Sequence, residues 1–72
     1  MKHRKVSKDE RRLIRLAEVQ RLSGLSRTGI YARMADRTFP QRVPLGGRAV
    51  GWVEEEVHAW VAARIEQREA AA

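Results

Sequence analysis

The side chains best suited to chemistry in this 72-residue chain are its arginines. The formal net charge is +6 at pH 7, and every basic side chain between residues 13 and 53 is an arginine. The planar guanidinium group matches phosphate oxygens and the edge of guanine. A polyanionic partner is therefore predicted, although surplus charge for solubility would produce the same composition. The seven residues are Arg15, Arg21, Arg27, Arg33, Arg37, Arg42 and Arg48.

The charge is distributed unevenly along the chain. Residues 1–12 carry six basic and two acidic side chains, whereas residues 54–72 carry two basic and five acidic ones. Because like charges repel, we expect the acidic C-terminal segment to face away from a polyanion.

Other residue types that often catalyse reactions or bind metals are scattered. The chain has no cysteine, which excludes a thiolate metal site and a disulfide. His3 and His58 have no ligand partner at useful spacing, and the consecutive carboxylates Glu54–Glu56 would point in different directions on a helix. Gly46 and Gly47 lack the lysine and helix start of a phosphate-binding loop. The sequence therefore predicts no catalytic residues, no metal site, no cofactor and no enzyme activity.

The arginines must be positioned by small elements, beginning with two helices joined by a short turn. Apolar residues from Leu13 onward include the steps of an amphipathic helix, which is expected over about residues 17–22. Gly24 suits a left-handed helix end, and Ser26 suits the N-cap of a second helix over residues 27–36. This spacing is typical of a helix-turn-helix, although a helix pair with no role in DNA binding can share it.

The second helix is predicted to bury one face and present another. Ile30 and Met34 lie four residues apart and should face the core. The opposite sector is flanked by Arg27 and Arg33 and carries mostly small side chains, which allow a backbone to approach base edges closely. Alanine there is also simply a good helix former. The outward set is Thr28, Tyr31, Ala32 and Ala35.

A β-hairpin is predicted after this helix. Gly46 and Gly47 can supply the positive φ angles of a tight turn, and Pro44 places its strand at a sheet edge. Arg48 would then stand just beyond the hairpin tip. The expected strand pairs are Val43 with Val50 and Leu45 with Arg48.

A closing helix follows the hairpin, with an apolar stripe that should pack on the domain. Phe39, Trp52 and Trp60 are predicted core residues, since large aromatic rings supply apolar area that a small domain lacks. The stripe comprises Val53, Val57, Trp60, Val61, Arg64 and Ile65.

The predicted fold class is mainly α with a small β-hairpin, in the form of a winged helix-turn-helix. Residues 1–12 would form a flexible basic N-terminal arm, 13–67 the winged domain and 68–72 a frayed C-terminal tail. No signal peptide or apolar run of membrane-spanning length occurs, so a cytoplasmic protein with no membrane partner is expected.

Residues 15–60 contain an LSR-x-x-IY helix, an FP break, an LG-x-RAVGW wing and an E-V-x-x-W closing helix. As an ordered set, these motifs resemble the AlpA family of prophage-type transcriptional regulators, and the match covers most of the chain outside its two tails. The resemblance implies a MerR-like winged-helix DNA-binding domain related in form to small excisionases. It places Ser26, Arg27, Thr28 and Tyr31 at the major groove and Arg48 at a phosphate or the minor groove. Arg33 completes the predicted DNA-binding set.

The preferred prediction is a sequence-specific regulator that binds double-stranded DNA and controls or assists integration and excision of a phage or mobile element. An excisionase-type recombination directionality factor is the alternative, followed by an RNA-binding or a protein-interaction module. A domain this small contacts few base pairs, which favours a homodimer or a cooperative multimer on DNA. The expected location is the nucleoid of a bacterial cell, for a bacterial or phage-encoded protein.

Overall fold

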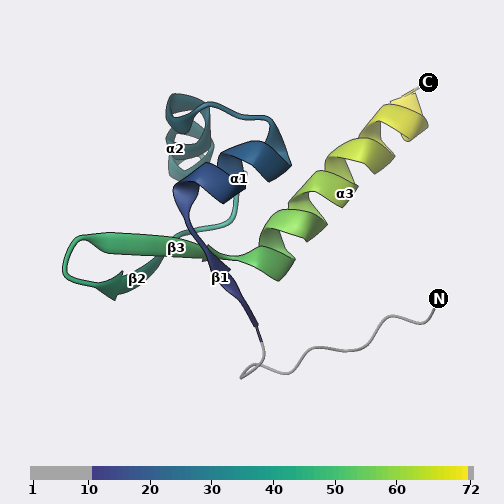
Figure 1. Ribbon diagram of the computed structural model, residues 1–72. Helices are drawn as coiled ribbons and strands as arrows, with labels where there is room; N and C mark the ends of the chain where they lie inside the picture. The colour runs from purple at the N-terminus through teal and green to yellow at the C-terminus, as the bar shows by residue number, and fades with distance from the viewer. Residues whose placement is uncertain (1–10, 72) are drawn as a thin grey trace.

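The chain forms two short helices, a small antiparallel sheet and a long closing helix (Figure 1). This computed structural model describes residues 11–71, so most of the predicted arm, residues 1–10, lies outside the described residues. The arrangement confirms the predicted mainly α, winged helix-turn-helix class. In chain order the elements are β1 (Leu13–Ile14), α1 (Leu16–Ser23), α2 (Arg27–Ala35), β2 (Val43–Gly46), β3 (Ala49–Val53) and α3 (Glu54–Ala71).

The turn between α1 and α2 is built as the sequence predicts. Gly24 ends α1 in the left-handed region at φ 75°, and its N–H donates to the Gln20 carbonyl. Ser26 caps α2, because its Oγ accepts a hydrogen bond from the Gly29 N–H at 3.0 Å. Leu25, between the two caps, packs against the core. Local capping chemistry therefore fixes the spacing of the helix pair.

Strand β1 was not predicted, because the sequence pattern placed the first helix over about residues 17–22 and assigned no strand at Leu13–Ile14. Leu13 pairs with Val53 and Ile14 pairs with Trp52, both antiparallel, and α1 begins only at Leu16. The pairing covers one edge of β3 and produces a three-stranded sheet in the order β1-β3-β2. Residues 13–14 are extended because they pair with β3, which lies about 40 residues later in the sequence. The spacing of apolar residues within the segment contains no information about this pairing.

The hairpin keeps its predicted place but not its predicted register. Leu45 is an extra residue in β2, and this bulge moves the two-residue turn to Gly47 and Arg48. Gly46 and Gly47 do adopt positive φ angles, 108° and 55°. Pro44 lies on an edge strand, as predicted. The expected pairs are wrong; the observed ones are Val43 with Gly51, Pro44 with Val50 and Gly46 with Ala49.

The core is centred on Trp52, which is fully buried in β3, the central strand of the sheet. Phe39 is buried as predicted, whereas Trp60 is only partly buried and packs at the rim of the core. Its indole N–H donates to the Thr38 carbonyl at 2.7 Å, and its ring meets Phe39 edge-on. The other buried core residues are Ile14, Val19, Ile30, Met34 and Val57.

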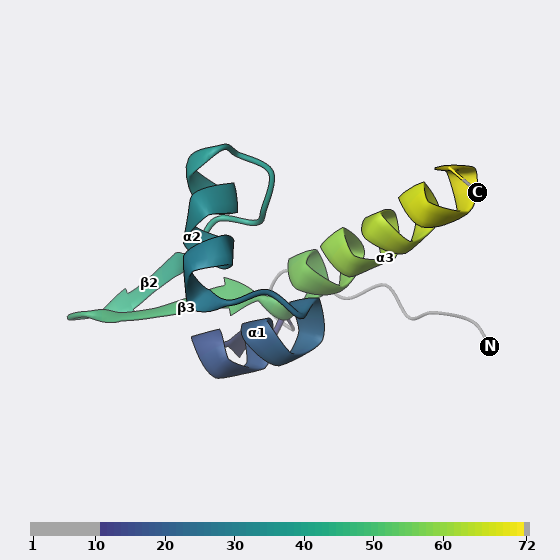
Figure 2. The same cartoon turned by 90° about the horizontal axis from the view of Figure 1, so that it is seen from above.

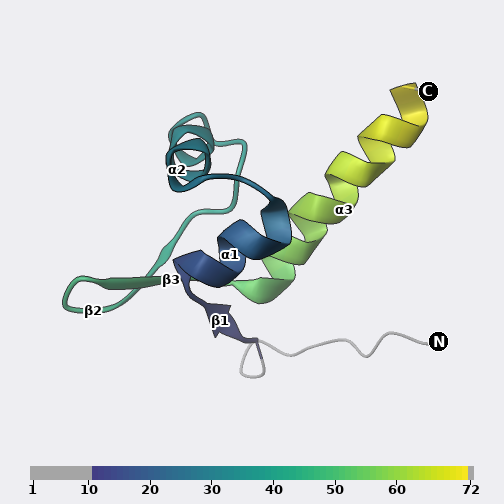
Figure 3. The same ribbon diagram turned by 45° about the horizontal axis from the view of Figure 1, so that its top comes forward.

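Helix α3 extends beyond the rest of the domain, on the side opposite the hairpin (Figures 1, 2 and 3). Three members of its predicted apolar stripe need correction, and one of them, Arg64, is exposed. Val53 belongs to β3, and Ile65 is 45% exposed because the helix has outrun the elements that could cover it. The helix runs through Ala71, past the predicted domain end at residue 67, and fraying of residues 68–72 stays a prediction.

Replacing Trp52 with alanine should destabilise the domain by about 3 to 5 kcal/mol, because it removes a large buried ring. Ile65→Ala is the matched control on an exposed position and should change stability by less than about 0.5 kcal/mol. Urea denaturation followed by circular dichroism measures both. Equal losses for the two variants would show that the core is not centred on Trp52.

Candidate nucleic-acid interface

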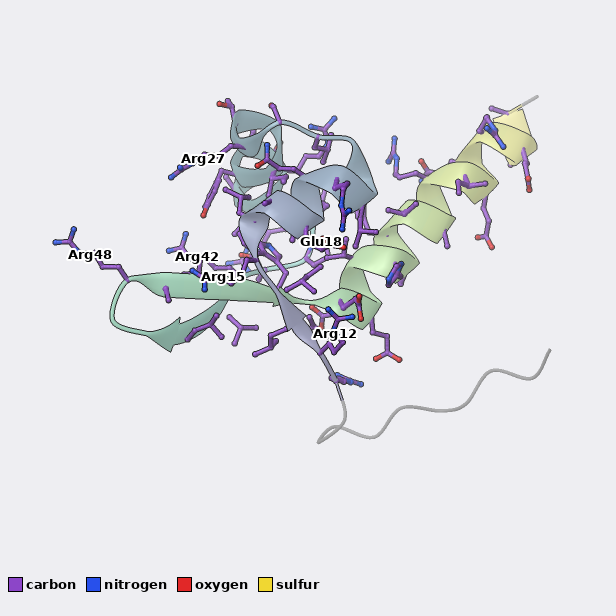
Figure 4. All side chains as sticks on the ribbon, viewed as in Figure 1. Arg12, Arg15, Glu18, Arg27, Arg42 and Arg48 are labelled. Carbon is purple, nitrogen blue, oxygen red and sulfur yellow. The ribbon has the colours of Figure 1, made fainter. Side chains whose placement is uncertain are left out.

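An open groove lies between α2 and the base of the hairpin. The side chains that line it come from one face of α2 and from the segment leading into β2: Arg27, Thr28, Tyr31, Ala32 and Arg42. Figure 4 shows Arg27, Arg42 and Arg48 extending on the hairpin side of the molecule, away from α3. The groove thus combines a helix face with a projecting hairpin on one side of the protein.

The N-terminal turn of α2 is exposed and carries positive charge. Ser26 and Arg27 open the helix, and the first turn contains no acidic side chain. The helix macrodipole adds partial positive charge at the same end. Thr28 and Ala32 are exposed beside Arg27, so this face presents small side chains between cations. Such a surface suits close approach to a polyanion.

Tyr31 is held between the core and two guanidinium groups. Its ring packs edge-on against Trp52, with the ring centroids 6.2 Å apart. The guanidinium carbon of Arg27 lies 5.7 Å from the Tyr31 centroid, and that of Arg42 lies 5.8 Å from it. These distances are within the range of cation–π attraction. Tyr31 is therefore partly buried rather than freely exposed.

Three predicted site residues do not line this groove: Ser26, which caps α2 beside it, and Arg33 and Arg48. Arg33 is two positions beyond Tyr31, on another face of α2, where its Nη1 lies 3.4 Å from the Gly29 carbonyl oxygen. Arg48 occupies the hairpin turn and is exposed at the tip. The structure therefore brings Arg27, Thr28 and Tyr31 together beside the Ser26 cap, with Arg48 as a separate outlying cation.

Arg42 belongs to the groove but was absent from the predicted set. It follows Pro40 and Gln41 in the loop that ends α2, so its nearness to Tyr31 depends on how that loop folds back. Gln41 secures the return by donating from Nε2 to the Met34 carbonyl at 3.0 Å. The sequence feature that could have indicated Arg42 is its position directly before the first strand of the predicted hairpin.

Among residues 11–71, no acidic side chain forms a salt bridge with the arginines near the groove. Within residues 11–71, salt bridges join Arg11 and Arg12 to glutamates of α3, and Arg21 to Glu18 within α1. None of them involves Arg27, Arg42 or Arg48. The acidic first turn of α3 lies at the far end of β3 from the hairpin tip (Figure 1). The charge of the groove therefore remains available to an anionic ligand.

Two further kinds of site, a metal-binding cluster and a membrane-spanning helix, are not found in residues 11–71. Across residues 11–71 there is no cluster of three or more histidine, aspartate or glutamate side chains arranged to hold a metal ion. No helix among these residues has the length and apolar character needed to cross a membrane.

Comparison with known proteins supplies independent information. The family described as "Prophage CP4-57 regulatory protein (AlpA)" matches residues 12–65. The chain is 46% identical over 59 residues to "Uncharacterized protein ORF88" of Enterobacteria phage P4, covering 82% of this chain and 67% of that protein. It is 36% identical over 59 residues to "DNA-binding transcriptional activator AlpA" of Escherichia coli (strain K12), covering 74% of this chain and 84% of that protein. No solved structure matches.

Removing the cap of α2 should loosen the helix that carries the groove. Ser26→Ala is expected to lower the free energy of unfolding by about 1 kcal/mol, because the Gly29 N–H loses its partner. Ser26→Asp keeps a capping oxygen and should retain most of the wild-type stability. Thermal unfolding by circular dichroism compares the two, and equal stabilities for Ser26→Ala and the wild type would show that the cap contributes nothing.

Proposed function

Because the chain belongs to the AlpA family of prophage regulatory proteins, we propose that it is a transcriptional regulator that binds double-stranded DNA sequence-specifically. The observation that carries this proposal is the groove beside α2, in which Arg27 and Thr28 lie near the hairpin base and whose arginines form no salt bridge within residues 11–71. One of its relatives bears the name of a DNA-binding transcriptional activator. The positive charge of the groove and the family membership both support DNA as the ligand.

In the proposed complex, α2 enters the major groove, which is wide enough to admit a helix. Arg27 would reach the N7 and O6 acceptors of a guanine with its two parallel donors, and Thr28 would offer a methyl and a hydroxyl to a neighbouring base. The small side chain of Ala32 would allow the backbone of α2 to approach the base edges closely. Ser26, at the helix start, would lie close to a phosphate that meets the free N–H groups of the first turn.

The hairpin is the proposed wing. Arg48 at its tip would contact the phosphate backbone or a narrow minor groove, which adds affinity but little base discrimination. Arg33, on another face of α2, would contact the backbone beside the groove that α2 occupies. Five of the six predicted residues thus divide into two groups. Arg27 and Thr28 read bases, whereas Ser26, Arg33 and Arg48 hold the duplex. A MerR-like form of the winged helix is part of this proposal.

The acidic start of α3 supports one orientation on DNA. Glu54, Glu55 and Glu56 form its first turn, at the opposite end of β3 from the hairpin tip. A duplex against α2 and the wing would avoid these carboxylates, whereas a duplex against α3 would meet them directly. This placement supports the proposed orientation, in which the acidic segment faces away from the polyanion.

The RNA alternative is less well supported than DNA. Proteins that read single-stranded RNA usually stack bases on exposed aromatic rings. Here Trp52 is fully buried, and the Tyr31 ring is occupied by Trp52 and two guanidinium groups. The aromatic residues near the groove therefore offer no free stacking surface.

The proposed setting is a phage or another mobile element in the cytoplasm of a bacterial cell. The family description names a prophage regulator, and one relative comes from phage P4. Control of integration or excision, including action as an excisionase-type directionality factor, belongs to this proposal. A homodimer or cooperative multimer on adjacent sites is proposed as well, since one small domain covers few base pairs. Selection from a random duplex pool tests this, because multimers require repeated half-sites at fixed spacing.

Substituting Arg27 and Arg48 separately should distinguish base reading from backbone contact. Arg27→Ala should cost about 1 to 3 kcal/mol on the selected site and much less on a scrambled duplex. Arg48→Ala should weaken binding to both duplexes by similar amounts. Fluorescence anisotropy at one fixed salt concentration measures all of these affinities.

Arg68→Ala, on the distal part of α3, is the matched control and should leave both affinities within about twofold of wild type. Equal losses on both duplexes for Arg27→Ala would remove it as a base reader. Wild-type protein that binds neither duplex would contradict the proposed function itself.

A further inference from the structure

We propose that Arg42 is a further DNA-contacting residue and that Tyr31 is a positioning residue that holds Arg42 and Arg27 as a pair. This inference rests on the proposed function, and it concerns the arrangement of side chains within the proposed DNA-binding groove. In the bound state, Arg27 takes a base edge in the major groove, and Arg42 takes a phosphate of the strand beside it. Tyr31 sets the separation between these two contacts.

Convergence of the two guanidinium groups is the main observation. Arg27 starts α2 and Arg42 immediately precedes β2, yet both lie within 6 Å of one ring centroid, at 5.7 Å and 5.8 Å. Both side chains also line the same open groove, together with Thr28 and Ala32. The groove therefore has a cation at the helix and another at the hairpin base.

The ring that links the cations is itself fixed. Tyr31 packs edge-on against Trp52, whose side chain is fully buried in β3. The loop carrying Arg42 is tied back to α2 by Gln41, which donates to the Met34 carbonyl. The side chains of Arg27 and Arg42 thus both contact the fixed ring of Tyr31. This contact lowers the conformational entropy that each arginine loses on binding a ligand.

Electrostatics favours an anion at this pair. Two like charges near one ring repel each other, and neither guanidinium takes part in a salt bridge within residues 11–71. A phosphate relieves that repulsion and accepts hydrogen bonds from the planar donor group. The aromatic ring attracts both cations without neutralising their charge, so their donors stay available to the duplex.

The chain supplies a matched control for this arrangement on α3. The guanidinium carbon of Arg64 lies 5.6 Å from the Trp60 ring centroid, nearly the same separation as in the groove. Arg64 does not line the groove, so Arg64→Ala removes an equal charge and an equivalent ring contact elsewhere.

The test measures affinity for the selected duplex, and its dependence on salt concentration, by fluorescence anisotropy. The variants are Arg42→Ala, Arg64→Ala, Tyr31→Phe, Tyr31→Leu and the double variant Tyr31→Leu with Arg42→Ala. Arg42→Ala should weaken binding about tenfold and reduce the slope of log affinity against log salt by about 1. Arg64→Ala should change the affinity by less than about twofold.

Tyr31→Phe keeps the ring and should bind within about twofold of wild type, whereas Tyr31→Leu should weaken binding about tenfold. The loss on adding Arg42→Ala should be smaller in the Tyr31→Leu background than in the wild type, because the leucine no longer positions the arginine. Thermal unfolding of each variant separates these effects from lost folding, since Tyr31 also touches the core.

Each departure from these results has a distinct meaning. If the wild type binds the duplex and Arg42→Ala binds it with the same affinity, the assignment of Arg42 is overturned and the proposed function is unaffected. Additive losses in the double variant, or a large loss in Tyr31→Phe, overturn the positioning role of Tyr31. Absence of duplex binding by the wild type contradicts the proposed function instead.

Discussion

The burial of Trp52 is the interaction on which the arrangement depends. Its side chain is fully buried in the central strand of the sheet, where Trp52 pairs with Ile14 of β1. Its ring also packs against Tyr31 of α2, so one residue joins the sheet to the second helix. Because β3 continues directly into both the hairpin turn and α3, the position of this ring sets the directions of the wing and the closing helix.

This constraint explains why the cations gather on one side. With α2 held over β3 through Tyr31, the helix face and the hairpin base enclose a groove whose arginines have no acidic partners among residues 11–71. The acidic first turn of α3 begins where β3 ends, at the opposite end of the strand from Arg48 (Figures 1 and 4). This arrangement favours approach of a polyanion to the groove side of the molecule, while at the other end Glu54 and Glu55 are paired with Arg12 and Arg11.

Sequence reasoning succeeded where short-range chemistry decides the structure. The left-handed end at Gly24, the Ser26 cap and the burial of Ile30 each follow from residues a few positions apart. It failed where distant partners decide. Ile14 is a strand residue because it meets Trp52, the hairpin register shifts because Leu45 bulges, and Arg42 enters the groove because its loop folds back onto α2. Periodicity and turn propensity contain no information about such long-range pairing.

The most direct test of the central claim is to locate the bound duplex on the protein surface. Titration of ¹⁵N-labelled protein with the selected duplex, followed by amide chemical shifts, reports contacts along the whole backbone. The largest changes are predicted for residues 26–33, which comprise the N-cap and first turns of α2, and for residues 42–49 around the hairpin, with little change in α3 beyond Val57. Shift changes concentrated on α3, with α2 and the hairpin unaffected, would contradict the account.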